Sequence, residues 1–109
     1  MTIIISSNKL GNGADDLGET LLKNYIYTLT EQAKMPEVMI FLNSGAFVTS
    51  KNSDSIMDLR HLAENGTKIL TCGSCINYYN LHDELAVGSI SNMTEIVGII
   101  NSSQNVVSL

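Results

Sequence analysis

The segment Lys68-Ile-Leu-Thr-Cys-Gly-Ser-Cys-Ile-Asn-Tyr-Tyr79 combines an apolar run, a pair of cysteines and a short helical pattern. Ile69 and Leu70 favour a buried strand, and Gly73 permits a tight turn directly after it. The residues that follow predict a short helix that ends at Asn80, since Asn tolerates the left-handed conformation that terminates helices. The segment therefore predicts a strand-turn-helix unit with both cysteines at the carboxyl end of the strand.

The preceding part of the chain shows the same alternation. Residues 2–6 begin with four β-branched residues and predict a first strand. Asp16 and Glu19 have the spacing of a capping box, and the apolar residues of the next helix repeat at helical spacing. We expect Leu17, Leu21, Leu22, Ile26, Leu29 and Ala33 to face the core. Pro36 ends this helix, and the apolar run 38–42 is typical of a strand that is buried on both faces.

The remaining segments complete an alternating pattern. A loop over residues 43–52 precedes a second helix, which Asn52 or Ser53 can cap and Gly66 ends. Residues 85–88 predict a weak strand or connector, a capping box at Asn92 and Glu95 begins the last helix, and residues 106–109 predict a final strand. The inward residues of these two helices are Ile56, Leu59, Leu62 and Ala63, then Met93, Ile96, Val97 and Ile100. The pattern predicts an α/β fold, a three-layer α/β/α sandwich around a mostly parallel sheet of about five strands.

Length and charge limit the classes of function. A chain of 109 residues fits a single domain over residues 1–109, and oligomerisation would let so small a domain bury more surface. With only 6 Lys and Arg and a net charge of −5, the chain lacks the basic face that binds nucleic acid or an anionic membrane. The amino-terminal residues resemble a strand rather than a signal peptide, and no apolar run approaches the roughly 20 residues of a membrane span. We expect a cytoplasmic homo-oligomer that uses no cofactor.

The cysteines Cys72 and Cys75 are the only two in the chain and are the predicted catalytic residues. In an open parallel sheet, chemistry collects outside the carboxyl ends of the strands. A cysteine at a strand-to-helix turn faces free backbone N–H groups, which stabilise thiolate over thiol. We therefore predict that Cys72 is the nucleophilic thiolate and that Cys75 receives sulfur from it or forms a disulfide with it.

Three other readings of the cysteine pair remain open. Both cysteines can be inert core residues, because free Cys often packs as a small hydrophobe. A zinc site would need His61 and His82 as further ligands, but the C-x2-C-x6-H spacing matches no common zinc pattern. A thioredoxin-type reductase would carry its motif after the first strand with a preceding Trp, whereas this chain has no Trp.

Small and polar residues in the neighbouring loops are candidates for a pocket around the cysteines. Loops 7–15, 43–52 and 71–75 should meet at one edge of the sheet. The residues that we expect to line such a pocket are Gly73, Ser74, Asn43, Ser44, Gly45, Gly11 and Gly13. Gly11 and Gly13 follow the first strand as in a nucleotide-binding loop, but position 16 is Asp rather than a third glycine. A flexible loop before a capped helix is the simpler interpretation of these two residues.

Four segments carry a resemblance to a known family. They are Ile4-Ile-Ser-Ser7 with Gly11-x-Gly-x-Asp-Asp-Leu-Gly18, Phe41-Leu-Asn-Ser-Gly-Ala46, Ile69-Leu-Thr-Cys-Gly-Ser-Cys-Ile-Asn-Tyr-Tyr79, and Leu85-Ala-Val-Gly-Ser-Ile-Ser-Asn-Met93. Over essentially its whole length the chain resembles the DsrE/DsrF-like family, and most closely the C-terminal domain of YedF-type proteins that are associated with selenium metabolism. YedF-type proteins usually also carry an N-terminal domain similar to TusA sulfur carriers, which this sequence does not include.

The resemblance implies a five-stranded α/β/α fold, homo-oligomers and sulfur transfer. Family members with an active cysteine carry sulfur as a persulfide, and their cysteine matches Cys72, whereas Cys75 matches a second cysteine of some relatives. The expected function is therefore a sulfurtransferase-like relay of sulfur or selenium, whose partners would be sulfur-donor and sulfur-acceptor proteins such as a cysteine desulfurase or a TusA-like carrier. The alternative is a non-catalytic oligomeric module that binds a small molecule or senses thiol redox state.

Overall fold

Strands and helices alternate along the chain as the sequence predicts. The computed structural model describes residues 1–109. The strands are β1 (Thr2–Ile5), β2 (Val38–Phe41), β3 (Lys68–Cys72), β4 (Ser89–Ser91) and β5 (Val106–Ser108). The helices are α1 (Asp15–Thr30), α2 (Ile56–Glu64), α3 (Gly73–Tyr78) and α4 (Met93–Ser102), and a 3-10 helix, η1 (Asn43–Phe47), follows β2.

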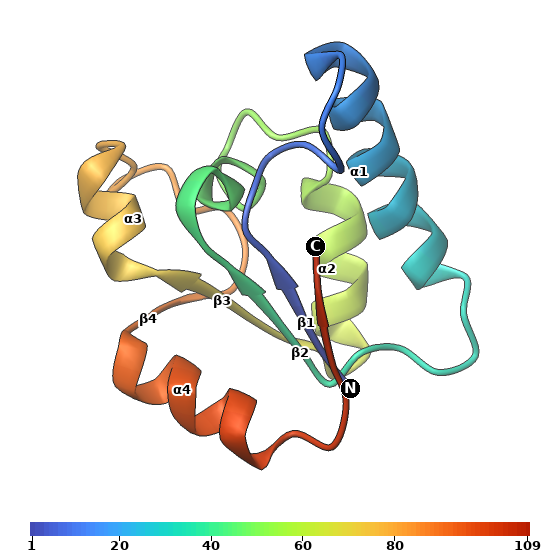
Figure 1. The fold of residues 1–109 in the computed structure, drawn as a ribbon, viewed down its shortest axis with the longest axis vertical. Helices are drawn as coiled ribbons and strands as arrows, with labels where there is room; N and C mark the ends of the chain where they lie inside the picture. The colour runs from blue at the N-terminus through green and yellow to red at the C-terminus, as the bar shows by residue number, and fades with distance from the viewer.

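The five strands form one sheet in the order β4-β3-β2-β1-β5, and every neighbouring pair is parallel. Helices α1 and α2 cover one face of the sheet and α4 covers the other, while α3 extends from the end of β3 (Figure 1). This confirms the predicted three-layer α/β fold. Because all strands run the same way, Ile5, Phe41 and Cys72 end at one edge of the sheet, which we call the carboxyl edge.

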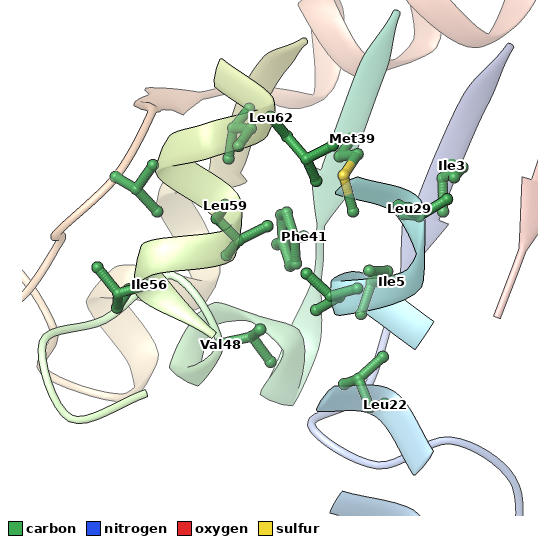
Figure 2. Packing of buried hydrophobic residues seen from close by; sticks show 13 residues of the cluster. Ile3, Ile5, Leu22, Leu29, Met39, Phe41, Val48, Ile56, Leu59 and Leu62 are labelled. Carbon is green, nitrogen blue, oxygen red and sulfur yellow. The ribbon is translucent and has the colours of Figure 1, made fainter. Parts of the chain in front are cut away.

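The two faces of the sheet are packed very differently. On the side of α1 and α2, a cluster of 13 buried apolar residues includes the fully buried Phe41 (Figure 2). On the side of α4, the buried cluster consists of Ile40, Cys72 and Ile96. Most of the hydrophobic stabilisation therefore comes from the first face. Cys72 belongs to the thinner core on the second.

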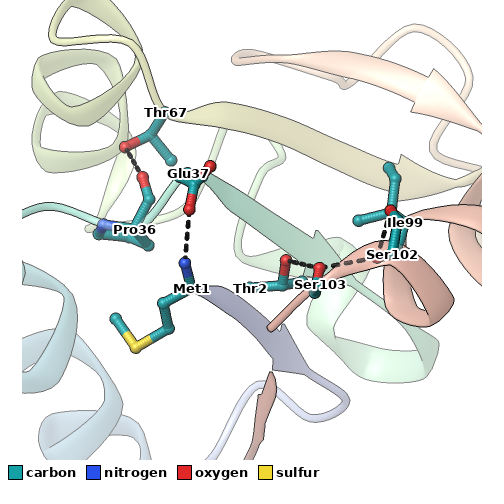
Figure 3. A network of polar contacts seen from close by, with 8 residues as sticks. All are labelled: Met1, Thr2, Pro36, Glu37, Thr67, Ile99, Ser102 and Ser103. Atoms are coloured by element: carbon teal, nitrogen blue, oxygen red, sulfur yellow. Dashed lines mark hydrogen bonds and ion pairs between the residues drawn. The ribbon is translucent and has the colours of Figure 1, made fainter. Parts of the chain in front are cut away.

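Polar contacts join the amino ends of β1, β2 and β3 at the opposite edge. The amino group of Met1 donates to the Glu37 carboxylate at 2.8 Å, and the Thr67 hydroxyl donates to the Pro36 carbonyl at 2.7 Å (Figure 3). The hydroxyls of Thr2 and Ser103 lie 2.6 Å apart, which ties β1 to the residue after α4. These contacts hold the amino ends of the strands in place, at the opposite end of the sheet from the carboxyl edge and the candidate site.

Two of the three predicted helix caps are wrong. Helix α1 begins at Asp15 after Ala14, which makes no side-chain cap, and the Asp16 carboxylate instead accepts the N–H of Leu17. Asp16 thus lies inside the first turn, and its capping box with Glu19 does not form. Helix α2 begins only at Ile56, too far along the chain for Asn52 or Ser53 to cap it. The third cap is confirmed, since the Asn92 side chain accepts the N–H of Glu95 at 2.9 Å.

The predicted helix ends at Gly66 and Asn80 are confirmed by their left-handed backbones, with φ of 102° and 55°. Residues 85–88 form the connector that the sequence allows as an alternative to a strand, and the fourth strand covers Ser89–Ser91. Gly88 has a φ of 76°, and a Cβ there would collide with the Ile69 carbonyl, so the chain turns at Gly88 before the strand begins. None of the helices combines the length and apolar character that a membrane span requires.

The predicted inward faces of the helices are too wide. Only part of each apolar stripe is buried, because strands of three to five residues offer a small surface to cover. Five residues that we expected in the core are exposed instead, namely Leu17, Leu21, Ala63, Met93 and Val97. Ala33 is also exposed and lies beyond the end of α1 at Thr30. Apolar surface is therefore left uncovered on both α1 and α4.

Candidate functional site

The two cysteines occupy different positions in one turn. Cys72 is the last residue of β3 and precedes the first residue of α3, and only 4% of its surface is exposed. It packs with Ile40 and Ile96 beneath α4. Cys75 lies in the first turn of α3 and is half-buried, and both cysteines are free thiols. The strand therefore directs Cys72 into the core, whereas the helix places Cys75 at the carboxyl edge.

Cys75 opens onto a hollow of about 350 Å³ between η1 and α3. The residues that line it are Asn43, Ser74, Cys75, Tyr78 and Tyr79. None of these side chains carries a formal charge at neutral pH, and the two phenol rings give the hollow an aromatic wall. The site is thus suited to an uncharged group that is small enough to reach the Cys75 sulfur.

Asn43 holds the Cys75 sulfur through its backbone. The Asn43 N–H donates to Cys75 Sγ at 3.0 Å, and the Asn43 side-chain oxygen accepts a hydrogen bond of 2.8 Å from the Tyr79 hydroxyl. Asn43 has a φ of 52°, a left-handed conformation that Asn adopts more readily than most residues. This conformation turns the chain from β2 into η1 and leaves the Asn43 N–H free for the sulfur.

The surroundings of Cys75 act on its pKa in opposite directions. Burial is the largest effect and raises the pKa of the Cys75 thiol, because the charged thiolate is less well solvated there. The Asn43 N–H lowers the pKa by stabilising the thiolate, and the neighbouring Cys72 thiol raises it. The net direction is upward, so Cys75 is mainly a thiol at neutral pH and the Asn43 contact limits the rise.

The predicted pocket residues fall into two groups. Asn43 and Ser74 line the hollow beside Cys75. Gly73 lies at the base of the turn, where a Cβ would stand 3.2 Å from both the Ile90 side chain and the Ser91 carbonyl. A glycine at this position therefore lets α3 start close against β4.

The other predicted residues support the site or lie away from it. The Ser44 hydroxyl accepts the N–H of Asn8 at 3.1 Å, which joins η1 to the loop after β1. Gly45 lets η1 approach the end of β1, because a Cβ there would collide with the Ile5 carbonyl oxygen. Gly11 and Gly13 have positive φ angles of 81° and 154° and do not line this hollow.

A second hollow of about 850 Å³ lies on the α1 side of the carboxyl edge. Its wall includes the carboxylates of Asp16, Glu19, Asp54 and Glu84 and a single lysine, Lys23. Neither cysteine lines it. This hollow was not predictable from the sequence, because its residues come from α1, η1 and three separate loops that only the fold brings together.

Metal-ligating side chains do not cluster anywhere in the structure, since no group of three or more His, Cys, Asp or Glu residues is close enough to hold an ion. His61 lies on α2, and His82 follows α3 in a loop. The four ligands of the zinc alternative are therefore not brought together.

Comparison with known proteins identifies a family model and solved structures that resemble this chain. A model of the DsrE/DsrF-like family matches residues 21–109. Among solved structures, MTH1491 of Methanobacterium thermoautotrophicum, a protein of unknown function, has a TM-score of 0.70 and 15% identity, covering 99% of this chain and 96% of its own. The YchN protein of E. coli has a TM-score of 0.71 and 10% identity, covering 99% and 97%.

A third solved structure, BT1422 of Bacteroides thetaiotaomicron, is described as a conserved protein of unknown function and has a TM-score of 0.67 and 10% identity, covering 99% of this chain and 93% of its own. At these identities the structural likeness establishes the shared α/β fold. No curated protein matches the sequence significantly.

Proposed function

The chain belongs to the DsrE/DsrF-like family, and from this premise we propose that it is a sulfur relay protein that carries a persulfide on the Cys72-Gly-Ser-Cys75 turn. One observation carries the proposal: of two neighbouring free thiols at the carboxyl edge, Cys75 is partly exposed and Cys72 is buried. Cys75 lines an open hollow, and Cys72 is buried with 4% of its surface exposed. The outer thiol can meet a donor, and the inner one can keep sulfur away from water.

The first transfer takes place at Cys75. Its thiolate attacks the outer sulfur of a donor persulfide, R–S–S–H, and forms a new bond between Cys75 Sγ and that sulfur. The S–S bond of the donor breaks, and R–S⁻ leaves with the electron pair and takes up the proton of the Cys75 thiol. The Asn43 N–H, 3.0 Å from Sγ, stabilises negative charge on the sulfur during the attack. No net oxidation occurs.

The second transfer moves sulfur inward to Cys72, the carrier that the sequence predicts. The Cys72 thiolate attacks the outer sulfur of the Cys75 persulfide, the S–S bond at Cys75 breaks, and the Cys75 thiolate takes the proton that Cys72 gives up. Burial beside Ile40 and Ile96 then shields the Cys72 persulfide from solvent. Reversal of both steps delivers the sulfur to an acceptor thiol at the hollow.

The chemistry of the hollow favours one class of donor. A persulfide end group is small and needs no ion pair, which suits a hollow lined by Asn43, Ser74 and two tyrosines. We propose that a cysteine desulfurase or a TusA-like carrier supplies or accepts the sulfur in the cytoplasm, where thiols stay reduced. The sequence resemblance to YedF-type proteins extends this proposal to selenium as an alternative cargo.

Self-association is part of the proposal. Uncovered apolar side chains remain on α1 at Leu17 and Leu21 and on α4 at Met93 and Val97, with exposures of 42% to 56%. Such residues in a small domain support a homo-oligomer, since association removes apolar surface from water.

Intact-protein mass spectrometry tests the relay. The wild type, Cys72→Ser, Cys75→Ser and the double variant are incubated with a cysteine desulfurase and cysteine. The proposal predicts that the wild type gains the mass of a sulfur atom that a reductant removes, and that the double variant gains none. A wild type that stays unmodified, while a control carrier protein in the same tube is loaded, would contradict it.

Cys75 packs against the buried cluster that contains Cys72, and this proximity favours a second candidate, a thiol-redox sensor. In that case an oxidant such as diamide converts the pair to a Cys72–Cys75 disulfide, and the wild type loses the mass of two hydrogen atoms without ever gaining sulfur from the desulfurase. The same spectra therefore separate the two candidates.

A further inference from the structure

Tyr79 contacts both ends of η1, the short helix that carries Asn43. Its hydroxyl donates to the side-chain oxygen of Asn43, the first residue of η1, at 2.8 Å. Its ring packs against Phe47, the last residue of η1, with ring centres 4.7 Å apart. Tyr79 also follows Cys75 by one helical turn, and its N–H donates to the Cys75 carbonyl at 3.1 Å. One side chain therefore connects the cysteine helix to the segment that binds the cysteine sulfur.

The contact between Asn43 and Cys75 depends on how η1 is placed. The Asn43 N–H is a backbone group, so it points at Cys75 Sγ only while the turn between β2 and η1 keeps its shape. Gly45 fixes the far side of that turn against the Ile5 carbonyl. The near side, which faces the hollow, is held by the hydrogen bond from Tyr79.

We propose that Tyr79 is a positioning residue for the sulfur chemistry of Cys75: its hydroxyl fixes the Asn43 carboxamide and so keeps the Asn43 N–H on the Cys75 sulfur. The inference rests on the proposed function for its biological meaning, but it concerns a property of the free thiol that can be measured separately. With the N–H in place, the thiolate and the persulfide anion are stabilised relative to their protonated forms. Without it, both anions form less readily.

The other titratable groups near Cys75 are few. Cys72 faces it from the end of β3, and the Tyr78 and Tyr79 phenols line the hollow on α3. Neither η1 nor the α4 residues that pack against Cys75 bring a charged side chain to it. In a Cys72→Ser background, a pH profile of thiol reactivity therefore reports Cys75 and its hydrogen bonds.

The test measures the rate at which Cys75 reacts with iodoacetamide between about pH 6 and pH 11 in the Cys72→Ser background, a range that extends above ordinary thiol titration because burial raises the pKa of Cys75. Tyr79→Phe removes one oxygen and keeps the ring that packs on Phe47. We expect its pH midpoint to rise by about half a unit to one unit, which makes the reaction about three to ten times slower near pH 7. Tyr78→Phe is the matched control, because the Tyr78 ring lines the same hollow and its hydroxyl makes no hydrogen bond. Its profile should coincide with that of the parent.

A second variant separates positioning from general loosening of the fold. Asn43→Gly keeps the backbone N–H and tolerates the left-handed backbone but has no carboxamide for Tyr79 to hold. It should reproduce the shift of Tyr79→Phe, and the double variant should add nothing further, because both changes remove the same bond. Coinciding profiles for Tyr79→Phe and the parent, or additive shifts in the double variant, would overturn the inference. Because the assay involves no sulfur donor, a wild type that fails to load sulfur would refute the relay and leave this result standing.

Discussion

Cys72 and Cys75 belong to the same turn, yet the fold gives them opposite surroundings. Cys72 ends β3 and packs beside Ile40 and Ile96, whereas Cys75 begins α3 and lines an open hollow. Only Cys75 accepts a hydrogen bond at its sulfur, from the Asn43 N–H. The last residue of the strand faces the layer that α4 covers, whereas the first turn of the helix faces the carboxyl edge. The position of each cysteine relative to the strand–helix boundary therefore determines whether solvent reaches its thiol.

The largest expected difference is in reactivity. In the native wild type, Cys75 should react with iodoacetamide at least about 100-fold faster than Cys72. The reagent reaches the buried Cys72 only after local opening of the α4 layer. Peptide mapping after timed labelling measures both rates in one sample. Similar rates at the two sites would show that the burial of Cys72 does not protect it.

A change in how η1 packs against the end of β1 should disturb Cys75 and leave Cys72 in place. Gly45→Ala would push a methyl group against the Ile5 carbonyl, so η1 must shift. We expect the free energy of unfolding to fall by about 1–3 kcal/mol in urea titrations, together with a change in the Cys75 labelling rate. Gly98→Ala is the matched control, since a Cβ there meets nothing within 4 Å and Ala favours the interior of α4. Equal stability of the two variants would contradict the close approach of η1 to β1.

A hydroxyl in place of each sulfur should separate the two sites by stability. Cys72→Ser places a polar group among Ile40 and Ile96 and should lower the free energy of unfolding by about 1–3 kcal/mol. Cys75→Ser should cost less, because its hydroxyl can accept the Asn43 N–H and lies beside the hollow. Thermal or urea unfolding of both variants, with Cys72→Ala as a control for loss of the thiol alone, checks the order. The reverse order would contradict the assignment of Cys72 to the core.

The smallest effect concerns the strand beside Cys72. Ser91, the neighbour of Cys72 in β4, donates to the Glu95 carboxylate, and this bond and then the Lys68 ammonium lower the pKa of Glu95 below its usual value. A carboxyl whose folded-state pKa is lowered stabilises the fold above its unfolded pKa, and this contribution is lost as pH falls through the lower folded value.

Urea titrations at several pH values check this sign. On acidification below about pH 4.3, the pKa of an unperturbed Glu, the wild type should lose more stability than Glu95→Gln. Parallel pH profiles for the two proteins would show that Glu95 has the same pKa in the folded and unfolded states. Because the Lys68 and Glu95 side chains are 54% and 39% exposed, raising the salt concentration should narrow the difference.

The strand-turn-helix at Cys72 and the order of elements were predictable from sequence, because strong local signals agree there. A β-branched run, Gly73 in the turn and left-handed residues at Gly66 and Asn80 each specify their own stretch of backbone. The exposed Leu17 and Met93 were predicted wrongly, because apolar spacing does not tell how wide a stripe the small sheet can cover.

The site could be predicted only in part. Sequence singled out the cysteines and Asn43, but the spacing of residues did not tell which thiol faces solvent. Which thiol faces solvent depends on how α4 packs over β3, and these two elements are distant in the sequence. The bond from Tyr79 to Asn43 joins residues 36 positions apart and leaves no local signature. Adjacent aromatic residues on a short helix are typical of packing, and the structure adds a hydrogen bond from the Tyr79 hydroxyl to Asn43.

The most direct test of the account compares sulfur loading of the two single variants in one time course by intact-protein mass spectrometry, with a cysteine desulfurase and cysteine as the source. Cys72→Ser should gain a reducible sulfur atom, since Cys75 still meets the donor, and it should lose that sulfur quickly to an added thiol. Cys75→Ser should load at least about tenfold more slowly, because its remaining thiol is buried. Rapid loading of Cys75→Ser together with no loading of Cys72→Ser would contradict the proposed entry of sulfur at Cys75.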